Sequence, residues 1–541
     1  MDYDWVVVGS GFGGSVSALR LTEKGYSVAV LECGRRFADD DYAESSWNAR
    51  RYFWMPRLGL RGILRLTLFK DVFIASGNGV GGGSLGYANT LYRARPAFFA
   101  DRQWDGLAEW DSELGPHYDV AERMLGVANY EGMTPADQLL REYGEEIGVG
   151  ETFKHTRVGI FFGPAGEKVA DPYFGGEGPE RTGCLRCGSC MVGCRYGAKN
   201  TLVKNYLWFA EKLGATVIPE RQVTEIRPLG PGDGSEGYEI VTEHPGAWFR
   251  KRQRTFRARG VVVAAGALGT NQLLADCKHG GSLPRISDRL GEVVRTNTES
   301  VQAVTMKNDE TDFTRSVAIT SSIYPDPDTH IEVVTYGRGG DALSGLFTMF
   351  TGPGTRATRP LRWIAGMLRH PFQAARLFWP AAWSRRTVIL LVMQTLDTAI
   401  SLRATPRRRG RGVRLQTEQD PERPNPTHIP AADAATKWFA ERTGGMAQSG
   451  ITEATLNVPT TAHILGGAVI GADAANGVVD TRNRVFGYEN LLICDGSAVP
   501  ANPGVNPSLT ITALAERAMS FIEEAEDGER RELPEAARAA R

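Results

Sequence analysis

Short apolar runs separated by glycine-rich turns mark the beginning and the end of this chain. Residues 4–8 form such a run, a glycine-rich turn and a helical stretch at about 15–24 follow, and residues 27–32 are apolar again. This order predicts a β-α-β unit at the start of the chain. A further helix is expected at about 510–525. Further strands are expected at 216–228, 238–243, 261–266 and 491–496.

The first turn has the sequence of a dinucleotide site. Residues 9–14 read Gly-Ser-Gly-Phe-Gly-Gly and match G-x-G-x-x-G between a strand and a helix. Gly9 permits the tight turn, Gly11 lets the backbone approach a pyrophosphate, and Gly14 lets helix and strand pack closely. Glu32 ends the second strand, where a carboxylate would accept hydrogen bonds from ribose hydroxyls. A purely structural glycine turn is the weaker alternative.

The strands expected to form the dinucleotide-binding sheet come from the beginning, middle and end of the chain. Residues from about 300 to 455 have a different sequence pattern. Apolar and polar positions alternate there at first, and the segment then becomes rich in Arg and Trp. We therefore expect an α/β protein with a discontinuous Rossmann-like cofactor domain and an inserted α+β substrate domain built on a mixed sheet. The expected ranges are 1–300 and 456–525 for the cofactor domain, 301–455 for the substrate domain and 526–541 for a charged, solvated tail.

A second glycine-rich segment favours a flavin over a nicotinamide. Residues 77–85 read Gly-Asn-Gly-Val-Gly-Gly-Gly-Ser-Leu, and such a run brings backbone close to a ligand. This segment resembles the flavin-contacting loop of the glucose–methanol–choline (GMC) oxidoreductases, and residues 104–127 and 261–274 resemble two further segments of that family. The resemblance implies FAD as the cofactor. The contacts it implies are Gly9, Gly11, Gly14, Glu32, Gly79, Gly82, Gly83, Ser84, Asn89, Asp495 and Asn506.

The C-terminal segments of that family carry the groups that face the flavin ring. Here they are the histidine before two glycines, His463, and the residue before Pro507, Asn506. The resemblance implies that His463 removes the hydroxyl proton while a hydride leaves carbon, and that Asn506 fixes the geometry. Asn506 matches the steroid-oxidising members, the cholesterol oxidases. Ile464 and Ala468 replace their usual Pro and Cys, so we expect a pocket of different shape.

A third catalytic candidate lies in the expected substrate domain. Residues 329–334 resemble the strand that carries the active-site glutamate of cholesterol oxidases, which implies that Glu332 moves a double bond from Δ5 to Δ4. Its apolar neighbours favour a raised pKa. A glutamate in an alternating strand can instead face solvent, and this alternative stays open.

Four of the seven cysteines stand within eleven residues. Cys184, Cys187, Cys190 and Cys194 have the C-x2-C-x2-C-x3-C spacing of bacterial ferredoxins, which predicts that they bind an iron–sulfur cluster, 4Fe-4S or 3Fe-4S. The run ends in Cys-Arg instead of Cys-Pro, and zinc or free thiols are the alternatives. A cluster beside a flavin would suit export of electrons to an acceptor protein, and so a dehydrogenase more than an oxidase.

Residues 342–396 contain seven Arg, several Trp and neither Asp nor Glu. Such a segment is typical of peripheral contact with anionic membranes, although a lid, a buried helix pair or an oligomer interface has equal weight. The net charge of −1 argues against nucleic acid. The first residues lack the features of a secretion signal, and no apolar run could span a bilayer. We therefore expect a cytoplasmic protein, possibly peripheral at the membrane surface.

These features predict FAD-dependent oxidation of a secondary alcohol to a ketone, with a 3β-hydroxysteroid or a similar bulky lipid alcohol as substrate. One alternative is a GMC dehydrogenase that acts on another bulky or long-chain alcohol or a glycoside. An alternative of another class is a flavin and iron–sulfur electron-transfer module. His463 and Asn506 argue against the module, since an electron carrier needs neither group.

Overall fold

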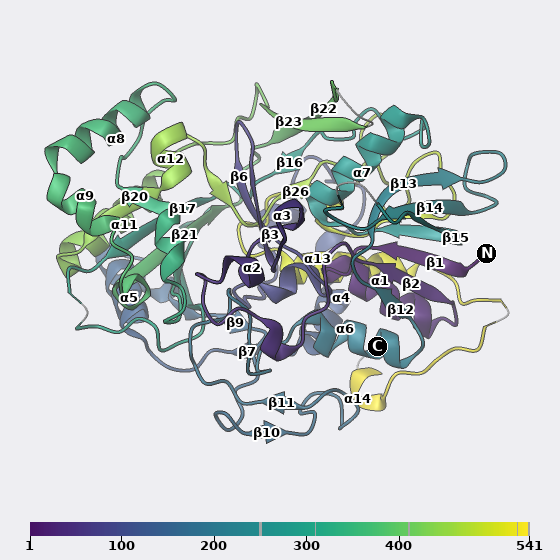
Figure 1. Ribbon diagram of the computed structural model, residues 1–541, viewed down its shortest axis with the longest axis horizontal. Helices are drawn as coiled ribbons and strands as arrows, with labels where there is room; N and C mark the ends of the chain where they lie inside the picture. Colours follow the sequence, from purple (N-terminus) through teal and green to yellow (C-terminus); the bar gives the residue numbers. More distant parts are fainter. Residues whose placement is uncertain (248–250, 309, 409–411, 527, 539–541) are drawn as a thin grey trace.

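The computed structural model describes residues 1–247, 251–308, 310–408, 412–526 and 528–538. Two large sheets occupy opposite ends of the molecule, and several of the smaller sheets lie between them (Figure 1). The segments that connect the two large sheets run through the centre of the molecule.

The first sheet is the predicted dinucleotide-binding sheet. Its order is β12-β2-β1-β15-β14-β13, with β27 also paired to β15, and its parallel strands come from both ends of the chain. The predicted strand 216–228 is two strands, because β12 runs parallel to β2 whereas β13 pairs antiparallel with β14. The strands are β1 (Tyr3–Val8), β2 (Val28–Leu31), β12 (Thr216–Ile218), β13 (Gln222–Pro228), β14 (Tyr238–Glu243), β15 (Arg254–Val263) and β27 (Leu491–Ile493).

A layer of helices from distant parts of the chain covers this sheet. Helix α1, which follows the first glycine turn, contacts both α13 and α6, and α13 also contacts α4. Helix α1 is almost wholly buried by these neighbours, so its sequence is apolar or small on nearly every side. The bounds are α1 (Phe12–Glu23), α4 (Trp110–Met124), α6 (Tyr206–Lys212), α7 (Gly266–Gly280) and α13 (Ser508–Ser520).

The second large sheet has the order β20-β24-β17-β21-β19-β18-β8. All of its pairs among the described residues are antiparallel, so the expectation of a mixed sheet is wrong. Helices α5 (Pro135–Glu146) and α11 (Pro430–Thr443) pack against it. The strands are β8 (Lys154–His155), β17 (Ser300–Thr305), β18 (Ile319–Asp326), β19 (Thr329–Val334), β20 (Phe347–Met349), β21 (Thr387–Gln394) and β24 (Met446–Gly450).

Two small sheets bring the C-terminal segment to the glycine loops. β25 (Thr460–Thr461) pairs with β6 (Phe73–Gly77), which leads directly into the second glycine-rich loop. β26 (Leu465–Gly466) pairs with β16 (Val294–Arg295), just before the second large sheet begins. The predicted histidine therefore stands between the two domains.

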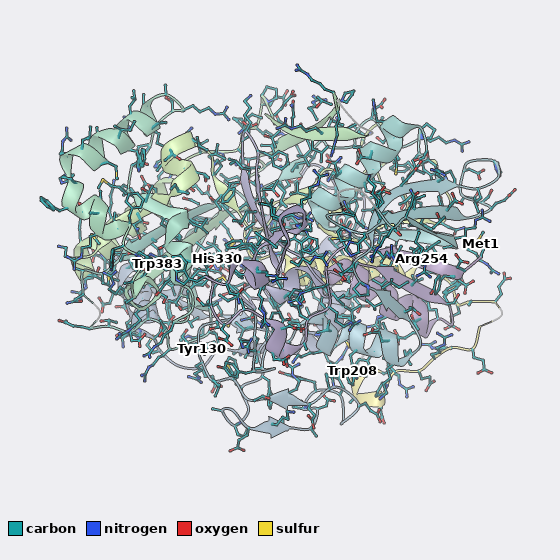
Figure 2. All side chains as sticks on the ribbon, in the orientation of Figure 1. Met1, Tyr130, Trp208, Arg254, His330 and Trp383 are labelled. Carbon is teal, nitrogen blue, oxygen red and sulfur yellow. The ribbon has the colours of Figure 1, made fainter. Side chains whose placement is uncertain are left out.

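The basic segment 342–396 divides into a buried and an exposed part. β20 and β21 belong to the second sheet, and Trp383 is buried against Phe347 (Figure 2). Helices α8 (Thr358–Arg369) and α9 (Pro371–Leu377) instead form an outer corner of the molecule (Figure 1). Within the described chain, no helix is long and apolar enough to cross a membrane.

The charged C-terminal tail is only partly solvated, since Glu529, Arg530 and Glu532 are exposed as expected but two apolar residues are not. Leu533 and Ala537 are buried in the core of the first domain, and the Arg531 amide donates to the Glu23 carbonyl at 2.9 Å. These two apolar side chains outweigh the charge pattern, because they cover core that would otherwise face water. The described part of the tail ends in the short helix α14 (Glu535–Arg538).

Candidate active site

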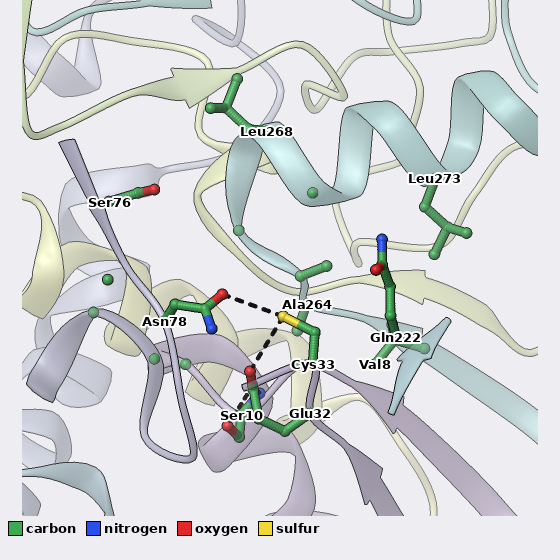
Figure 3. Close-up of a pocket in the computed structure, with 18 of the residues that line it drawn as sticks. Val8, Ser10, Glu32, Cys33, Ser76, Asn78, Gln222, Ala264, Leu268 and Leu273 are labelled. Atoms are coloured by element: carbon green, nitrogen blue, oxygen red, sulfur yellow. Dashed lines mark hydrogen bonds between the residues drawn. The ribbon is translucent and has the colours of Figure 1, made fainter. Parts of the chain in front are cut away.

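A cavity of about 190 Å³ lies where the first turn, the second glycine loop and the start of α7 meet (Figure 3). Among the predicted cofactor residues, its lining includes Gly9, Gly11, Glu32, Gly82 and Gly83. Ile464, the neighbour of the predicted catalytic histidine, also lines it. The cavity thus joins the two glycine motifs to the C-terminal segment.

The space around each position explains three of the glycines in the first motif. Gly9 has a φ of +100°, and an added Cβ would lie 2.2 Å from the Ala264 carbonyl oxygen. A Cβ on Gly14 would lie 2.1 Å from the Gly9 oxygen, so helix and strand could not pack closely. A Cβ on Gly11 would meet nothing within 4 Å and would point into open space. Space of this kind is what the pyrophosphate of a dinucleotide requires.

The N-terminus of α1 supplies a partial positive charge at the same place. The helix begins at Phe12, and no side chain caps its first N–H groups. Free N–H groups at a helix start bind phosphates, and the helix dipole adds to their attraction for an anion. The residues present therefore fit a dinucleotide cofactor.

The second glycine loop packs directly on the first. A Cβ on Gly82 would lie 2.6 Å from the Gly11 Cα, so the two backbones are in contact. Gly79 faces Leu85 and Phe37, and the Ser84 hydroxyl donates to the Gly81 oxygen at 2.6 Å, so these two residues shape the loop and do not line the cavity. Asn89, at a φ of 71°, is fully buried outside the lining.

Glu32 is held in place by the two loops that surround it. Its carboxylate accepts hydrogen bonds from the Ser10 amide at 3.1 Å, the Ser10 hydroxyl at 2.7 Å and the Gly34 amide at 2.8 Å. Figure 3 shows Glu32 beside Cys33 and Asn78 in the cavity wall. Sequence patterns did not single out Arg65, which reaches the same wall and donates to Asn78 at 3.4 Å. It stands alone in β5 (Leu64–Leu68), where no local motif marks it.

Asp495 lies outside the cavity lining and is fully engaged by protein groups. Its Oδ2 accepts from the Gly266 amide at 2.8 Å and the Thr270 hydroxyl at 2.6 Å, and its Oδ1 accepts from the Ser497 amide at 2.8 Å. Burial raises the pKa of this carboxyl. The contacts tie the end of β27 to the start of α7, so Asp495 shapes the cavity wall from behind.

His463 forms an ion pair with a carboxylate that no sequence pattern indicated. Its Nδ1 is hydrogen-bonded to Glu299 Oε1, and the Ala462 amide donates to Glu299 Oε2 at 2.9 Å. The His463 amide donates to the Thr461 hydroxyl at 2.9 Å, which fixes the backbone of the segment. The ring therefore has one nitrogen engaged and Nε2 left for another partner.

Glu332 and Asn506 form a second buried pair. The Asn506 amide donates to Glu332 Oε2 at 3.3 Å, while Glu332 Oε1 and Asn506 Oδ1 have no hydrogen-bond partner among the described residues. The pKa of Glu332 is raised to about 8, chiefly by burial; the Asn506 hydrogen bond lowers it, and the nearby Glu299 charge adds to the rise. The solvent-facing alternative is wrong, because β19 lies between β18 and β21 and is buried along its whole length.

Asn297 joins the two pairs. Its side-chain amide donates to Glu299 at 3.3 Å and to the Val505 carbonyl at 3.1 Å, next to Asn506. Its Oδ1 accepts from the Gly504 amide at 2.9 Å. One buried amide therefore connects the histidine–carboxylate pair to the loop that carries Asn506.

The four clustered cysteines share one loop but do not surround a metal site. Cys184, Cys187, Cys190 and Cys194 are free thiols that line a cavity of about 20 Å³. Burial raises the pKa of Cys184 to about 12 and that of Cys190 to about 11, which favours the protonated thiol. No group of three or more His, Cys, Asp or Glu in the described chain could hold a metal ion. The geometry therefore does not support the predicted cluster.

The site can be compared with those of known proteins. A family model described as FAD dependent oxidoreductase matches residues 4–343, and one described as GMC oxidoreductase matches residues 393–515. A cholesterol oxidase of Mycobacterium tuberculosis is 50% identical over 533 residues, which cover 96% of this chain and 91% of that protein. A cholesterol oxidase of Acinetobacter baumannii is 48% identical over 527 residues, 96% of this chain and 94% of that protein.

Among solved structures, the chain is similar to the pyridoxine 4-oxidase from Mesorbium loti. The TM-score is 0.61 at 16% sequence identity, and the match covers 96% of this chain and 99% of the other. At this identity the likeness concerns the fold.

Proposed function

Because the chain belongs to the FAD-dependent GMC oxidoreductases, we propose that it oxidises the 3β-hydroxyl group of a steroid to a ketone. The observation that carries the proposal is the pair of His463 with Glu299, next to the cavity-lining Ile464, together with the buried pair of Asn506 and Glu332. Two relatives of about 50% identity with the name cholesterol oxidase support the substrate class.

The reaction removes a hydride and a proton from the alcohol. FAD supplies the hydride acceptor when it is bound. His463 Nε2 accepts the hydroxyl proton, since its Nδ1 is already engaged by Glu299. Asn506 holds the substrate oxygen, and the apolar body of a steroid suits a site from which water is excluded.

The direct test is anaerobic mixing of the purified flavoprotein with a 3β-hydroxysteroid. We expect loss of the oxidised flavin absorbance, and no change with the 3α epimer at the same concentration. Bleaching by long-chain alcohols or glycosides but not by the steroid would contradict the substrate class. Admission of air or of a one-electron acceptor to the reduced protein then identifies the electron acceptor.

Replacing Glu332 by Gln is expected to spare alcohol oxidation and abolish migration of the double bond from Δ5 to Δ4. Proton transfer between ring carbons needs the carboxylate form, and burial raises the pKa of Glu332 to about 8. In the parent protein the isomerisation rate should therefore rise with pH and level off above about 8. The measurement is the ratio of Δ4 to Δ5 ketone. Equal loss of both steps would show that Glu332 acts only in the fold.

We also propose that α8 and α9 touch an anionic membrane surface, from which a lipid substrate would be drawn. Leu368 is 76% exposed and Phe372 is 90% exposed, and both lie on this outer corner. Trp379, just beyond α9, is 66% exposed. Apolar side chains on a basic amphipathic helix insert into the interface of anionic lipid layers. Arg359 of α8 is not exposed. It is buried against Glu453 and anchors α8 to the body of the protein.

The double variant Leu368→Asp and Phe372→Asp should bind phosphatidylglycerol vesicles at least about tenfold more weakly, because each buried apolar side chain contributes about 1.5–3 kcal/mol. The matched control is Trp208→Asp, an exposed aromatic in α6 far from this corner (Figure 2). The measurement is vesicle cosedimentation, with FAD content recorded for each variant. Unchanged binding would favour a lid or an oligomer contact.

An iron–sulfur cluster remains a prediction from the cysteine spacing alone. It predicts about three to four iron atoms per chain with matching sulfide after anaerobic preparation, and loss of the iron in Cys187→Ser. Alcohol-driven flavin reduction should survive this change. Metal analysis with electron paramagnetic resonance decides the question. A preparation without iron leaves four free thiols, in agreement with the loop geometry.

A further inference from the structure

We propose that Glu299 is a positioning residue that holds the proton of His463 on Nδ1 and keeps Nε2 free to act as the base. The proposal rests on the proposed function of His463. It adds a residue that no sequence motif marks, and it gives that residue a role in the reaction distinct from that of Glu332.

The contacts of Glu299 favour a carboxylate that accepts hydrogen bonds at both oxygens. Each oxygen of the carboxylate accepts from one fixed donor, the Ala462 amide at 2.9 Å or the Asn297 side-chain amide at 3.3 Å, and Nδ1 of His463 is hydrogen-bonded to the oxygen that Asn297 also approaches. The Glu299 side chain is fully buried, and His463 is its only ion-pair partner among the described residues. A buried carboxylate that accepts only from donors stays charged, because those bonds replace its hydration.

The consequence for the imidazole follows from which atoms can donate. In a neutral histidine, one ring nitrogen carries the proton and the other accepts. Since Glu299 can only accept, the proton of His463 lies on Nδ1 and the lone pair lies on Nε2. When the substrate hydroxyl transfers its proton to Nε2, the positive charge forms next to the Glu299 carboxylate, which stabilises it. The hydride and that proton together account for the two electrons and two hydrogens that the alcohol loses.

Glutamine at this position cannot make the same contacts. It has the shape of glutamate but only one acceptor oxygen, whereas donors approach both oxygens of Glu299. If the amide oxygen accepts from Ala462, the amide NH2 faces His463 and moves the ring proton to Nε2. The base is then blocked although the fold and the cofactor cavity are unchanged.

The experiment compares Glu299→Gln with the parent holoenzyme, labelled with ¹⁵N-histidine. We expect the ring signals of His463, assigned by their loss in His463→Asn, to report an Nδ1–H tautomer in the parent and an Nε2–H tautomer in the variant. Steroid-driven flavin reduction should slow by roughly 10²–10⁴-fold at an unchanged half-saturating steroid concentration and FAD content. Glu299→Asp restores the charge and should recover part of the rate lost in Glu299→Gln.

A second histidine–carboxylate pair gives the matched control. His428 Nε2 is hydrogen-bonded to Asp433 at 3.0 Å. Asp433→Asn should therefore change the His428 signals and leave flavin reduction unchanged. An unchanged His463 tautomer in Glu299→Gln, or a slowing in Asp433→Asn equal to that in Glu299→Gln, would overturn the proposal. A tautomer change in Glu299→Gln combined with full activity of His463→Asn would contradict the function proposed for His463 and leave the Glu299 contact standing.

Discussion

His463→Ala is expected to slow steroid-driven flavin reduction by roughly 10²–10⁴-fold, the usual cost of losing an acid or base group. The substrate hydroxyl proton then loses its proposed acceptor, and the Glu299 carboxylate does not replace it because it is fully buried and already bound by the Ala462 amide. The side chain does not line the dinucleotide cavity, so FAD content should match that of the parent protein. The measurement is anaerobic stopped-flow absorbance at saturating steroid.

The control for this change is His428→Ala. His428 is also a partly buried histidine paired with a carboxylate, but its partner is Asp433 in α11. Its removal should leave flavin reduction at the parent rate. Near-normal reduction in His463→Ala would remove this histidine from the mechanism, even if Glu299 and Asn506 remain in place.

Gly11→Val should yield a colourless protein that no longer binds FAD. An added Cβ at Gly11 points into the open cavity beside the α1 N-terminus, so its methyl groups would occupy the space of the pyrophosphate. The fold should survive, because the Cβ would meet no protein atom within 4 Å. The measurements are the flavin spectrum after purification and the FAD dissociation constant of the refilled protein.

Gly115→Val is the matched control for this change. Gly115 lies in α4, and a Cβ there would also meet nothing within 4 Å, but the position is outside the cavity. This variant should keep its flavin. Retention of FAD by Gly11→Val would mean that the cofactor does not cross the first turn.

The sequence predicted the parts of the site that depend on local backbone geometry. Gly9, Gly11 and Gly14 could be read directly, because a tight turn and a helix start impose their spacing over a few residues. The burial of Glu332 could not be read from β19 alone, since alternation does not show that neighbouring strands and helices cover both faces of a strand. Only the position of β19 inside the second sheet decides between a buried and a solvent-facing side chain for Glu332.

Contacts between distant segments account for what the sequence did not predict. Glu299 and His463 are 164 positions apart, and no periodicity links the end of one segment to a loop of another. Arg65 reaches the cavity wall from an otherwise unremarked strand. The charged tail was expected in solvent because its composition is polar, yet Leu533 and Ala537 are buried in the core and the Arg531 amide binds the Glu23 carbonyl. A single sequence shows composition and the spacing of nearby residues. Contacts between distant segments depend on how the whole chain folds, so they cannot be read from it.

During biosynthesis, β27 is made long after the other strands of its sheet. β27 pairs with β15, and α13 buries α1, so the first β-α-β unit lacks two of its neighbours until nearly the whole chain has been made. At about 5–20 residues per second, the ribosome needs roughly 25–100 s to reach β27 after it has finished β1. During that interval the side of α1 that packs against α13 is uncovered, and exposed apolar surface of this kind favours aggregation. The lining of the dinucleotide cavity is likewise incomplete until Ile464 has been made.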